Sequence, residues 1–248
     1  MPWHAKKLGR YNMETSQAQD NASQIALILH GRGWTTEAIA GCLGNIQSEG
    51  FMNPWHWQGA DDNRPDLVPT YQEFLDWTGD EAKDHGYGLY QFTYANKYIN
   101  AQNSSLPGYG PNFDDIVGLV TDGKAQTIFM ENTFEDEWRN NQYGYYYQGF
   151  VVDQEVPVST FAKFFMTAAE YKSAKEDMEV MAGAYECCYE RPREEPPDQK
   201  YASESYYARV YRAEFWYDFL KKKFPGWDEQ SNFMYYLKPN WKRSRRIW

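Results

Sequence analysis

Glu49 is the residue best placed for acid–base chemistry, because it closes a stretch with the pattern of a buried helix. Within residues 37–54, Ile39, Leu43 and Ile46 recur at helical spacing and predict one apolar stripe. The 3.6-residue period puts Glu49 roughly 60° from Ile46, at the margin of that stripe. A carboxylic acid held there is partly desolvated, which raises its pKa and lets it donate a proton near neutral pH. The alternative is a solvated carboxylate at a frayed helix end.

The flanking residues indicate where this helix begins and ends. Thr35 or Thr36 is expected to cap the first turn, and Gly50 is expected to adopt the left-handed conformation after the last turn. Pro54 then blocks any continuation. Glu49 is therefore predicted at the end of a core helix, half inside the protein and half facing a cleft.

Three sequence blocks around and after Glu49 carry a family resemblance. They are Gly44-Asn-Ile-Gln-Ser-Glu-Gly-Phe-Met-Asn-Pro54, Gly86-Tyr-Gly-Leu-Tyr-Gln-Phe-Thr93 and Tyr189-Glu-Arg-Pro192. In this order they resemble the phage-tail lysozyme family of the lysozyme-like superfamily, whose members include tail-knob domains of small podoviruses. The resemblance does not cover residues 1–20 or the chain beyond about residue 195.

The resemblance implies a fold and a reaction. The expected fold is a mainly helical α+β, lysozyme-like domain over residues 21–192, after an N-terminal arm (1–20) and before a C-terminal helical and aromatic extension (193–248). The implied reaction is cleavage of the β-1,4 bond between N-acetylmuramic acid and N-acetylglucosamine in peptidoglycan, with Glu49 as general acid. No metal and no cofactor is expected.

A second carboxylate is the uncertain part of the implied chemistry. Related animal-type lysozymes place it immediately before the Tyr-Gly-x-x-Gln segment, where this chain has Gly86, and the nearest acid is Asp84. Asp80, Asp62 and Asp61 are alternatives, and each of these acids is otherwise a solvated loop charge. Goose-type lysozymes and lytic transglycosylases work with a single obvious glutamate, so the choice between hydrolase and transglycosylase stays open.

The resemblance also implies that the second block faces the sugar, with Gln91 and Tyr90 among the substrate-binding residues. The Gln91 amide offers a donor and an acceptor to an acetamido group, or else it bridges the local backbone. Tyr87 is expected either to pack under Glu49 or to lie in the core. Asn45, one turn before Glu49, either orients it by a hydrogen bond or has a structural role.

Capping residues and periodicity predict further helices. Asn21 with Gln24 is expected to open a helix through about residue 30, and Ser173 with Glu176 to open another that ends at Tyr189. Other predicted helices span residues 71–77, 94–100, 114–120, 124–140 and 159–171. A charged, proline-rich linker (192–200) precedes a long helix (203–223), on which one apolar side is expected to hold Tyr207, Val210, Tyr211 and Leu220.

Composition narrows the choice of partners. Of the 248 residues, 42% are hydrophobic and 18% aromatic, which allows a large core and also rings for stacking against sugars. A net charge of −10 argues against nucleic acid, whose phosphates need a basic face. No apolar run reaches membrane-spanning length, so no membrane partner is expected. The three cysteines show neither disulfide-framework nor metal-ligand spacing.

The expected location is the phage tail within the virion, or the host cytoplasm before release, with action on the host cell wall. Lys6, Lys7 and Arg10 are not followed by an apolar segment, so no signal peptide is expected. Release through a holin-type pore as a free endolysin is the competing role. The basic C-terminal residues are either a solvated end or a docking arm for other tail (knob) proteins: Lys238, Lys242, Arg243, Arg245 and Arg246.

Two other functions stay open. A structural tail or wall-binding protein would keep the fold without turnover, which the uncertain identity of the second carboxylate favours and the presence of Glu49 opposes. Action on chitin would use the same bond geometry on a different polymer.

Overall fold

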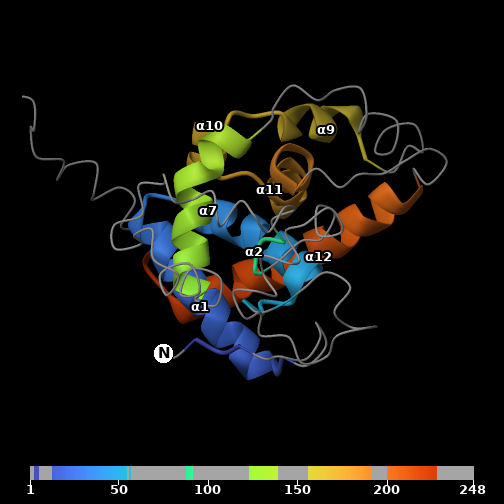
Figure 1. Cartoon of the computed structure of the whole chain (residues 1–248). Helices are drawn as coiled ribbons and strands as arrows, with labels where there is room; N and C mark the ends of the chain where they lie inside the picture. The colour runs from blue at the N-terminus through green and yellow to red at the C-terminus, as the bar shows by residue number, and fades with distance from the viewer. Residues whose placement is uncertain are drawn as a thin grey trace, which may run out of the picture.

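A computed structural model of the chain describes residues 3–5, 13–54, 56, 88–91, 123–138, 156–190 and 200–227. Its helices are α1 (Thr15–Gly31), α2 (Thr36–Gly50), α7 (Gly123–Glu137), α9 (Val158–Phe164), α10 (Ala168–Ser173), α11 (Met178–Tyr185), the π-helix η5 (Glu186–Glu190) and α12 (Lys200–Lys223) (Figure 1). The prediction of a mainly helical protein is confirmed. These ranges contain no strand, so the α+β class stays a prediction.

Helix α2 lies at the centre of the described structure, with α12 along one side, α11 along another and α1 beside it (Figure 1). The Thr35 hydroxyl accepts a hydrogen bond from the Ala38 N–H at 3.2 Å, which confirms the predicted cap. Burial extends beyond the predicted stripe and includes Ala40 and Cys42. A helix that is buried on nearly every side needs neighbours all round.

Two glycines on α2 let these neighbours approach closely. A Cβ atom at Gly44 would lie 2.7 Å from the Arg209 carbonyl oxygen and 2.8 Å from the Ala213 backbone nitrogen of α12. One at Gly41 would lie 2.8 Å from the carbonyl carbon of Met181 on α11. Because backbone atoms cannot move aside as a flexible side chain does, the missing Cβ atoms set the depth at which both helices pack.

Helix α1 begins earlier than predicted. Glu14 and Gln17 form its capping box, in which the Glu14 N–H donates to the Gln17 side chain at 3.4 Å. Asn21, the predicted start, lies within the helix and is fully buried; its amide donates to the carbonyl oxygen of Met52 at 2.8 Å. The predicted start is therefore wrong, since a polar residue that suits a cap here serves a tertiary contact.

The stretch predicted as one helix over 159–171 is divided. Thr167 and Glu170 form a capping box that starts α10 separately from α9, and this local hydrogen bonding competes with a continuous helix. The start of the next helix was also predicted wrongly at Ser173. It is Asp177 that caps α11, where its carboxylate accepts from the Val180 N–H at 3.0 Å.

The bounds predicted for α12 are nearly right, and half of the predicted apolar side is confirmed, since Val210 and Leu220 are buried whereas the two tyrosines are not. Tyr207 is 43% exposed and Tyr211 is 73% exposed. The buried side carries Tyr206, Arg209, Val210, Ala213, Trp216 and Leu220. These residues recur every three or four positions, so the stripe obeys the helical period with a charged residue inside it. The extension predicted from residue 193 thus contains a helix that packs against α2 and α11.

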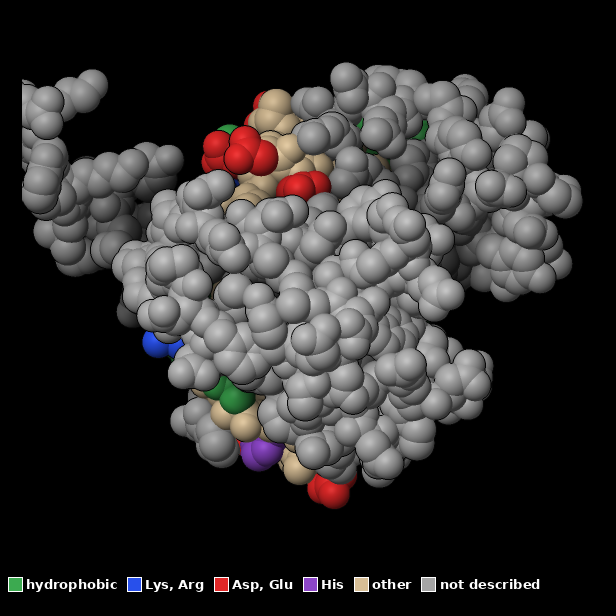
Figure 2. All heavy atoms as spheres, in the orientation of Figure 1, with side chains coloured by type: hydrophobic (Ala, Val, Ile, Leu, Met, Phe, Trp, Pro, Cys, Tyr) green, Lys and Arg blue, Asp and Glu red, His purple; other side chains and the backbone are tan. Residues whose placement is uncertain are grey.

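Ion pairs hold α7 near the ends of α1 and α10. Glu131 on α7 pairs with Arg32, just after α1, and lies 3.4 Å from the Lys172 nitrogen on α10. The same nitrogen lies 3.4 Å from Glu135. Acidic side chains gather at this end of the molecule, over α7 and α10 (Figure 2). Water screens the outer contacts, in which Arg32 is 36% and Glu135 is 69% exposed, so these two pairs contribute modestly to the stability of the fold.

We expect Gly44→Ala to destabilise the protein by about 1–3 kcal/mol, because the new methyl group must push α12 away from α2. Urea denaturation followed by circular dichroism measures this change. Gly31→Ala is the matched control: no atom lies within 4 Å of its Cβ position, so a change within about 0.5 kcal/mol is expected. Equal stability of the two variants would show that the α2–α12 distance is not set by Gly44.

Candidate active site

Glu49 lies in the last turn of α2, and its side chain is 29% exposed. One carboxylate oxygen, Oε1, accepts a hydrogen bond from Nη2 of Arg209 on α12. The Arg209 side chain is 5% exposed. The candidate acid is therefore a partly exposed carboxyl group that rests on a buried guanidinium.

Each nitrogen of that guanidinium has a defined partner. Besides Nη2 on Glu49, Nη1 donates to Asn45 Oδ1 at 3.0 Å and Nε pairs with Glu186 Oε1 at 3.0 Å. Burial lowers the pKa of Arg209, but the charges of Glu186, Glu49 and Glu190 outweigh it, and the pKa is raised above its ordinary value. Arg209 is thus a permanent cation that joins α2, η5 and α12.

Two other side chains of α12 also form hydrogen bonds with residues near the end of α2. Nη1 of Arg212 donates to the Ser48 hydroxyl at 2.6 Å, next to Glu49. The indole N–H of Trp216 donates to Gln47 Oε1 at 2.8 Å. These bonds fix the register of α12 against the last turns of α2, and so fix where Arg209 meets Glu49.

Among the contacts that the structure describes, Asn45 is linked to Glu49 through Arg209. Its amide nitrogen donates to the carbonyl oxygens of Gly41 at 2.9 Å and Ala182 at 3.2 Å, while its oxygen accepts from Arg209. The role of Asn45 in orienting Glu49 stays a prediction. In the structure such an effect would act through Arg209, which donates to both side chains.

Glu186 is a second carboxylate near Glu49, and sequence reasoning missed it. It lies on η5, is fully buried and shares Arg209 with Glu49. A side chain with no exposure cannot touch a sugar, so Glu186 is not a nucleophile or a base that activates water. The predicted candidate Asp84 and its alternatives Asp80, Asp62 and Asp61 lie outside the described residues.

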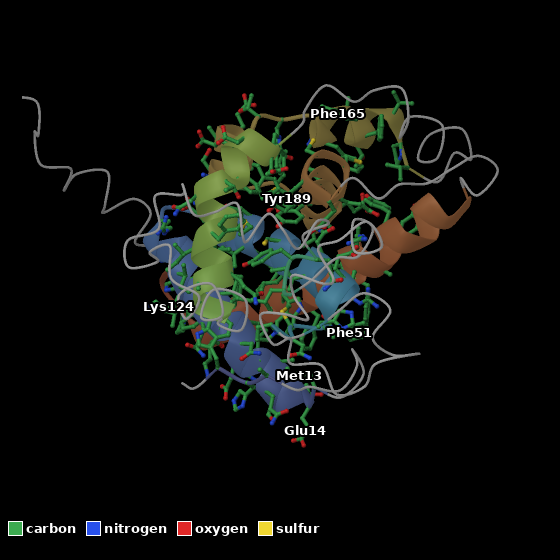
Figure 3. All side chains as sticks on the ribbon, viewed as in Figure 1. Met13, Glu14, Phe51, Lys124, Phe165 and Tyr189 are labelled. Carbon is green, nitrogen blue, oxygen red and sulfur yellow. The ribbon has the colours of Figure 1, made fainter. Side chains whose placement is uncertain are left out.

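The chain turns sharply after Glu49, and the prediction for Gly50 was wrong. Gly50 is the last residue of α2, and Phe51 follows the end of that helix (Figure 3). Phe51 (φ 51°) and Met52 (φ 62°) adopt the left-handed conformation. The structure gives another reason for a glycine here. A Cβ atom at Gly50 would lie 2.9 Å from the carbonyl oxygen of Gly88, so the missing side chain lets the second sequence block lie against the first.

Residues 88–91 form a turn. The Gln91 amide nitrogen donates to the carbonyl oxygens of Gly88 at 2.8 Å and His56 at 3.2 Å, so it bridges the local backbone. Tyr90 is 1% exposed, and its hydroxyl donates to Thr127 at 3.1 Å. Burial raises the pKa of Tyr90 well above its usual value, so its phenol stays neutral. Contact of either residue with a sugar stays a prediction; Tyr87 lies outside the described residues.

Gln126 on α7 joins the two blocks, and sequence reasoning missed it as well. This fully buried amide accepts from the Leu89 N–H at 2.9 Å and donates to the Pro54 carbonyl oxygen at 2.8 Å. One side chain therefore satisfies a backbone donor in the turn and a backbone acceptor after α2. Its polarity on a buried face of a predicted helix was the available signal.

The described geometry is consistent with a lysozyme-like domain: a mainly helical unit in which the central helix ends in a partly exposed glutamate. Residues 20–220 match the phage tail lysozyme family, and the chain belongs to this family. The resemblance seen in the three sequence blocks is thereby confirmed. The match also includes most of α12, beyond the limit of that resemblance.

One relative is Morphogenesis protein 1 of Bacillus phage B103. It is 39% identical over 80 residues, a stretch that covers 32% of this chain and 17% of that protein. Family and relative together indicate a phage tail-associated, lysozyme-like protein of the virion. Within the described ranges no helix has the length and apolarity needed to cross a membrane, and no cluster of His, Cys, Asp or Glu suits a metal ion.

We expect Gln126→Met to destabilise the protein by about 1–3 kcal/mol, because it leaves the Leu89 N–H and the Pro54 carbonyl without their shared partner. Urea denaturation gives the change in free energy. Thr133→Val on the same helix is the control. The Thr133 hydroxyl bonds only to carbonyls of its own helix among the contacts described, so a change below about 0.5 kcal/mol is expected. A loss no larger for Gln126→Met would contradict its linking role.

Proposed function

We propose that this protein cleaves the β-1,4 bond between N-acetylmuramic acid and N-acetylglucosamine in peptidoglycan, and that Glu49 is the general acid. The observation that supports this most directly is the position of Glu49, partly exposed at the end of a buried helix and held by a buried arginine. Membership of the phage tail lysozyme family supports the substrate and the reaction class.

The geometry around Glu49 suits proton donation from one particular oxygen. Arg209 has only N–H donors, so Oε1 must act as an acceptor in this pair. In the acid form the proton is then carried by Oε2. That proton passes to the glycosidic oxygen as the bond to the anomeric carbon breaks, and the sugar ring acquires oxocarbenium character.

The second half of the reaction has two forms in this proposal. In hydrolysis, water adds to the anomeric carbon with help from a second carboxylate, for which Asp84 is the candidate. In transglycosylation, the sugar's own C6 hydroxyl adds instead, assisted by the N-acetyl group. Its proton passes to the Glu49 carboxylate left by the first step, and no second carboxylate is required. The complete burial of Glu186 supports neither form over the other, because Glu186 cannot reach the ring.

The biological setting is also part of the proposal. The family and its phage context support a role at the tail, where the enzyme would open the cell wall at infection, with release as a lysis enzyme as the alternative. The α+β class and the division into an arm (1–20), a catalytic domain (21–192) and an extension (193–248) that docks to tail proteins remain proposals. Within this division, α12 contributes Arg209 to the catalytic domain's site.

A second candidate function is wall binding without turnover, in a structural tail protein. One observation favours it: the Glu49 carboxylate is already engaged in an ion pair with the Arg209 guanidinium. Retained binding to wall material without bond cleavage would distinguish this function from a glycosidase.

We expect Glu49→Gln to lower the rate of peptidoglycan cleavage by about 10²–10⁴-fold, because glutamine keeps the shape but has no acidic proton. Purified protein is incubated with isolated peptidoglycan, and reducing ends and muropeptide masses are followed. Glu37→Gln is the control. It removes a carboxylate from the first turn of the same helix, where the amide oxygen can still accept from the Tyr217 hydroxyl, and near-normal activity is expected.

Product masses decide between the forms of the reaction. Products lighter by one water indicate transglycosylation, and free reducing ends indicate hydrolysis. Equal activity of the Glu49→Gln variant and the unmodified protein would contradict the role of Glu49. No activity in either protein, with retained pelleting on wall material, would favour the binding function. Parallel assays on chitin test the third candidate function, which is cleavage of that polymer.

A further inference from the structure

Two carboxylates share one buried guanidinium at the end of α2. Arg209 contacts Glu186 through Nε and Glu49 through Nη2, and its third nitrogen binds the neutral Asn45. An arginine does not lose its charge in a protein, so the cluster always contains one cation. With both glutamates ionised, the cluster carries one net negative charge, and with one glutamate protonated it is neutral.

Solvent access distinguishes the two glutamates. The Glu186 side chain has no exposure, the Arg209 side chain is 5% exposed, and the Glu49 side chain is 29% exposed. A buried cation without a counter-ion loses much of its solvation free energy and recovers none of it, so one carboxylate must remain ionised beside Arg209. Only Glu49 can exchange a proton with water or with a bound sugar.

We propose that Glu186 is the fixed counter-ion of Arg209, and that by balancing this charge it leaves Glu49 able to carry the proton for the glycosidic oxygen. The catalytic part of this inference rests on the proposed function, whereas its electrostatic part concerns the folded protein alone. Glu186 is a positioning residue in this scheme, since it acts through Arg209 and does not touch substrate.

The other charged groups around the site are consistent with a balanced environment. In the part of the chain that the structure describes, α12 contributes Arg209 and Arg212, which is bonded to Ser48 beside Glu49. The π-helix η5 contributes Glu186 and Glu190, both of which act on the charge of Arg209. Two cations therefore face two anions, and removal of Glu186 leaves an excess positive charge that favours ionised Glu49.

The direct test is the titration of the Glu49 carboxyl by NMR, with ¹³C-labelled glutamate and assignment through Glu49→Gln. In Glu186→Gln we expect the titration midpoint of Glu49 to fall by about one pH unit or more, because an opposite charge nearby stabilises the carboxylate. The amide introduced by this substitution keeps an oxygen that can accept from Arg209 Nε. The control Glu179→Gln, at an exposed position of α11, is expected to leave the midpoint unchanged.

The rate of cleavage gives a second readout. A general acid must be protonated, so the rate falls as pH rises through its midpoint. In Glu186→Gln this fall in rate should occur at a lower pH, and the shift should equal the change in the titration midpoint of Glu49. The rate at neutral pH should then fall about tenfold for each pH unit by which the midpoint is lowered, and it should recover in acid. A merely structural role for Glu186 would lower the rate at every pH without changing the pH at which the rate falls.

The double variant Glu186→Gln with Arg209→Gln keeps the proposal testable if the single variant does not fold. Removing both charges of a buried pair together is tolerated far better than removing one. If Glu186 balances Arg209, the double variant should titrate within about half a pH unit of the unmodified protein. If Arg209 instead mainly serves Glu49, its loss should raise the midpoint by about one pH unit or more, and the proposal is overturned.

The two readouts separate this inference from the proposed function. A shifted Glu49 titration in a protein that does not cleave peptidoglycan supports the counter-ion role and contradicts the glycosidase. Normal cleavage with an unshifted titration in a folded Glu186→Gln variant contradicts the counter-ion role and leaves the glycosidase intact.

Discussion

The described structure depends on satisfying one buried cation. Arg209 cannot release its charge, so burial on α12 requires acceptors that converge from other elements. Glu49 and Asn45 supply them from α2, and Glu186 supplies another from η5. These contacts leave little freedom in the rotation of α12 about its axis or in its position along α2. The same contacts that hold the helices together therefore also hold the candidate acid.

Helix α2 accommodates this arrangement because it carries glycines, which have no side chain, at the positions where its neighbours approach. Glycines 41 and 44 admit the backbones of α11 and α12, and Gly50 admits the 88–91 turn. With its sides covered in this way, the helix meets solvent in its last turn, where Glu49 is partly exposed. Packing that buries the helix and exposure of one carboxylate are thus two results of the same set of contacts.

Local chemistry made part of this predictable. The apolar stripe and the Thr35 cap located α2, and the three blocks located Glu49 and the family. The buried side of α12 was predicted correctly at Val210 and Leu220 but wrongly at Tyr207 and Tyr211. A tyrosine fits an apolar stripe in the sequence whether its ring is buried or exposed, because the ring is amphipathic. Arg209, which lies on the buried side of α12, was not predicted as a buried residue. Its partner Glu49 lies 160 positions away, so nothing in the surrounding sequence marks it as buried, and Gln126 was missed for the same reason.

A general acid must carry a proton, whereas an ion pair favours a carboxylate. These two requirements conflict only if the pair of Glu49 and Arg209 is considered without its surroundings. The partial negative charge at the C-terminal end of α2 repels an ionised carboxylate in its last turn, and a second carboxylate, Glu186, competes for the same guanidinium. Arg209 thus supplies Glu49 with orientation, while much of its charge is taken up by a partner that never meets water. The gradient of exposure from Glu186 through Arg209 to Glu49 then determines which group exchanges a proton: the one at which the buried network reaches solvent.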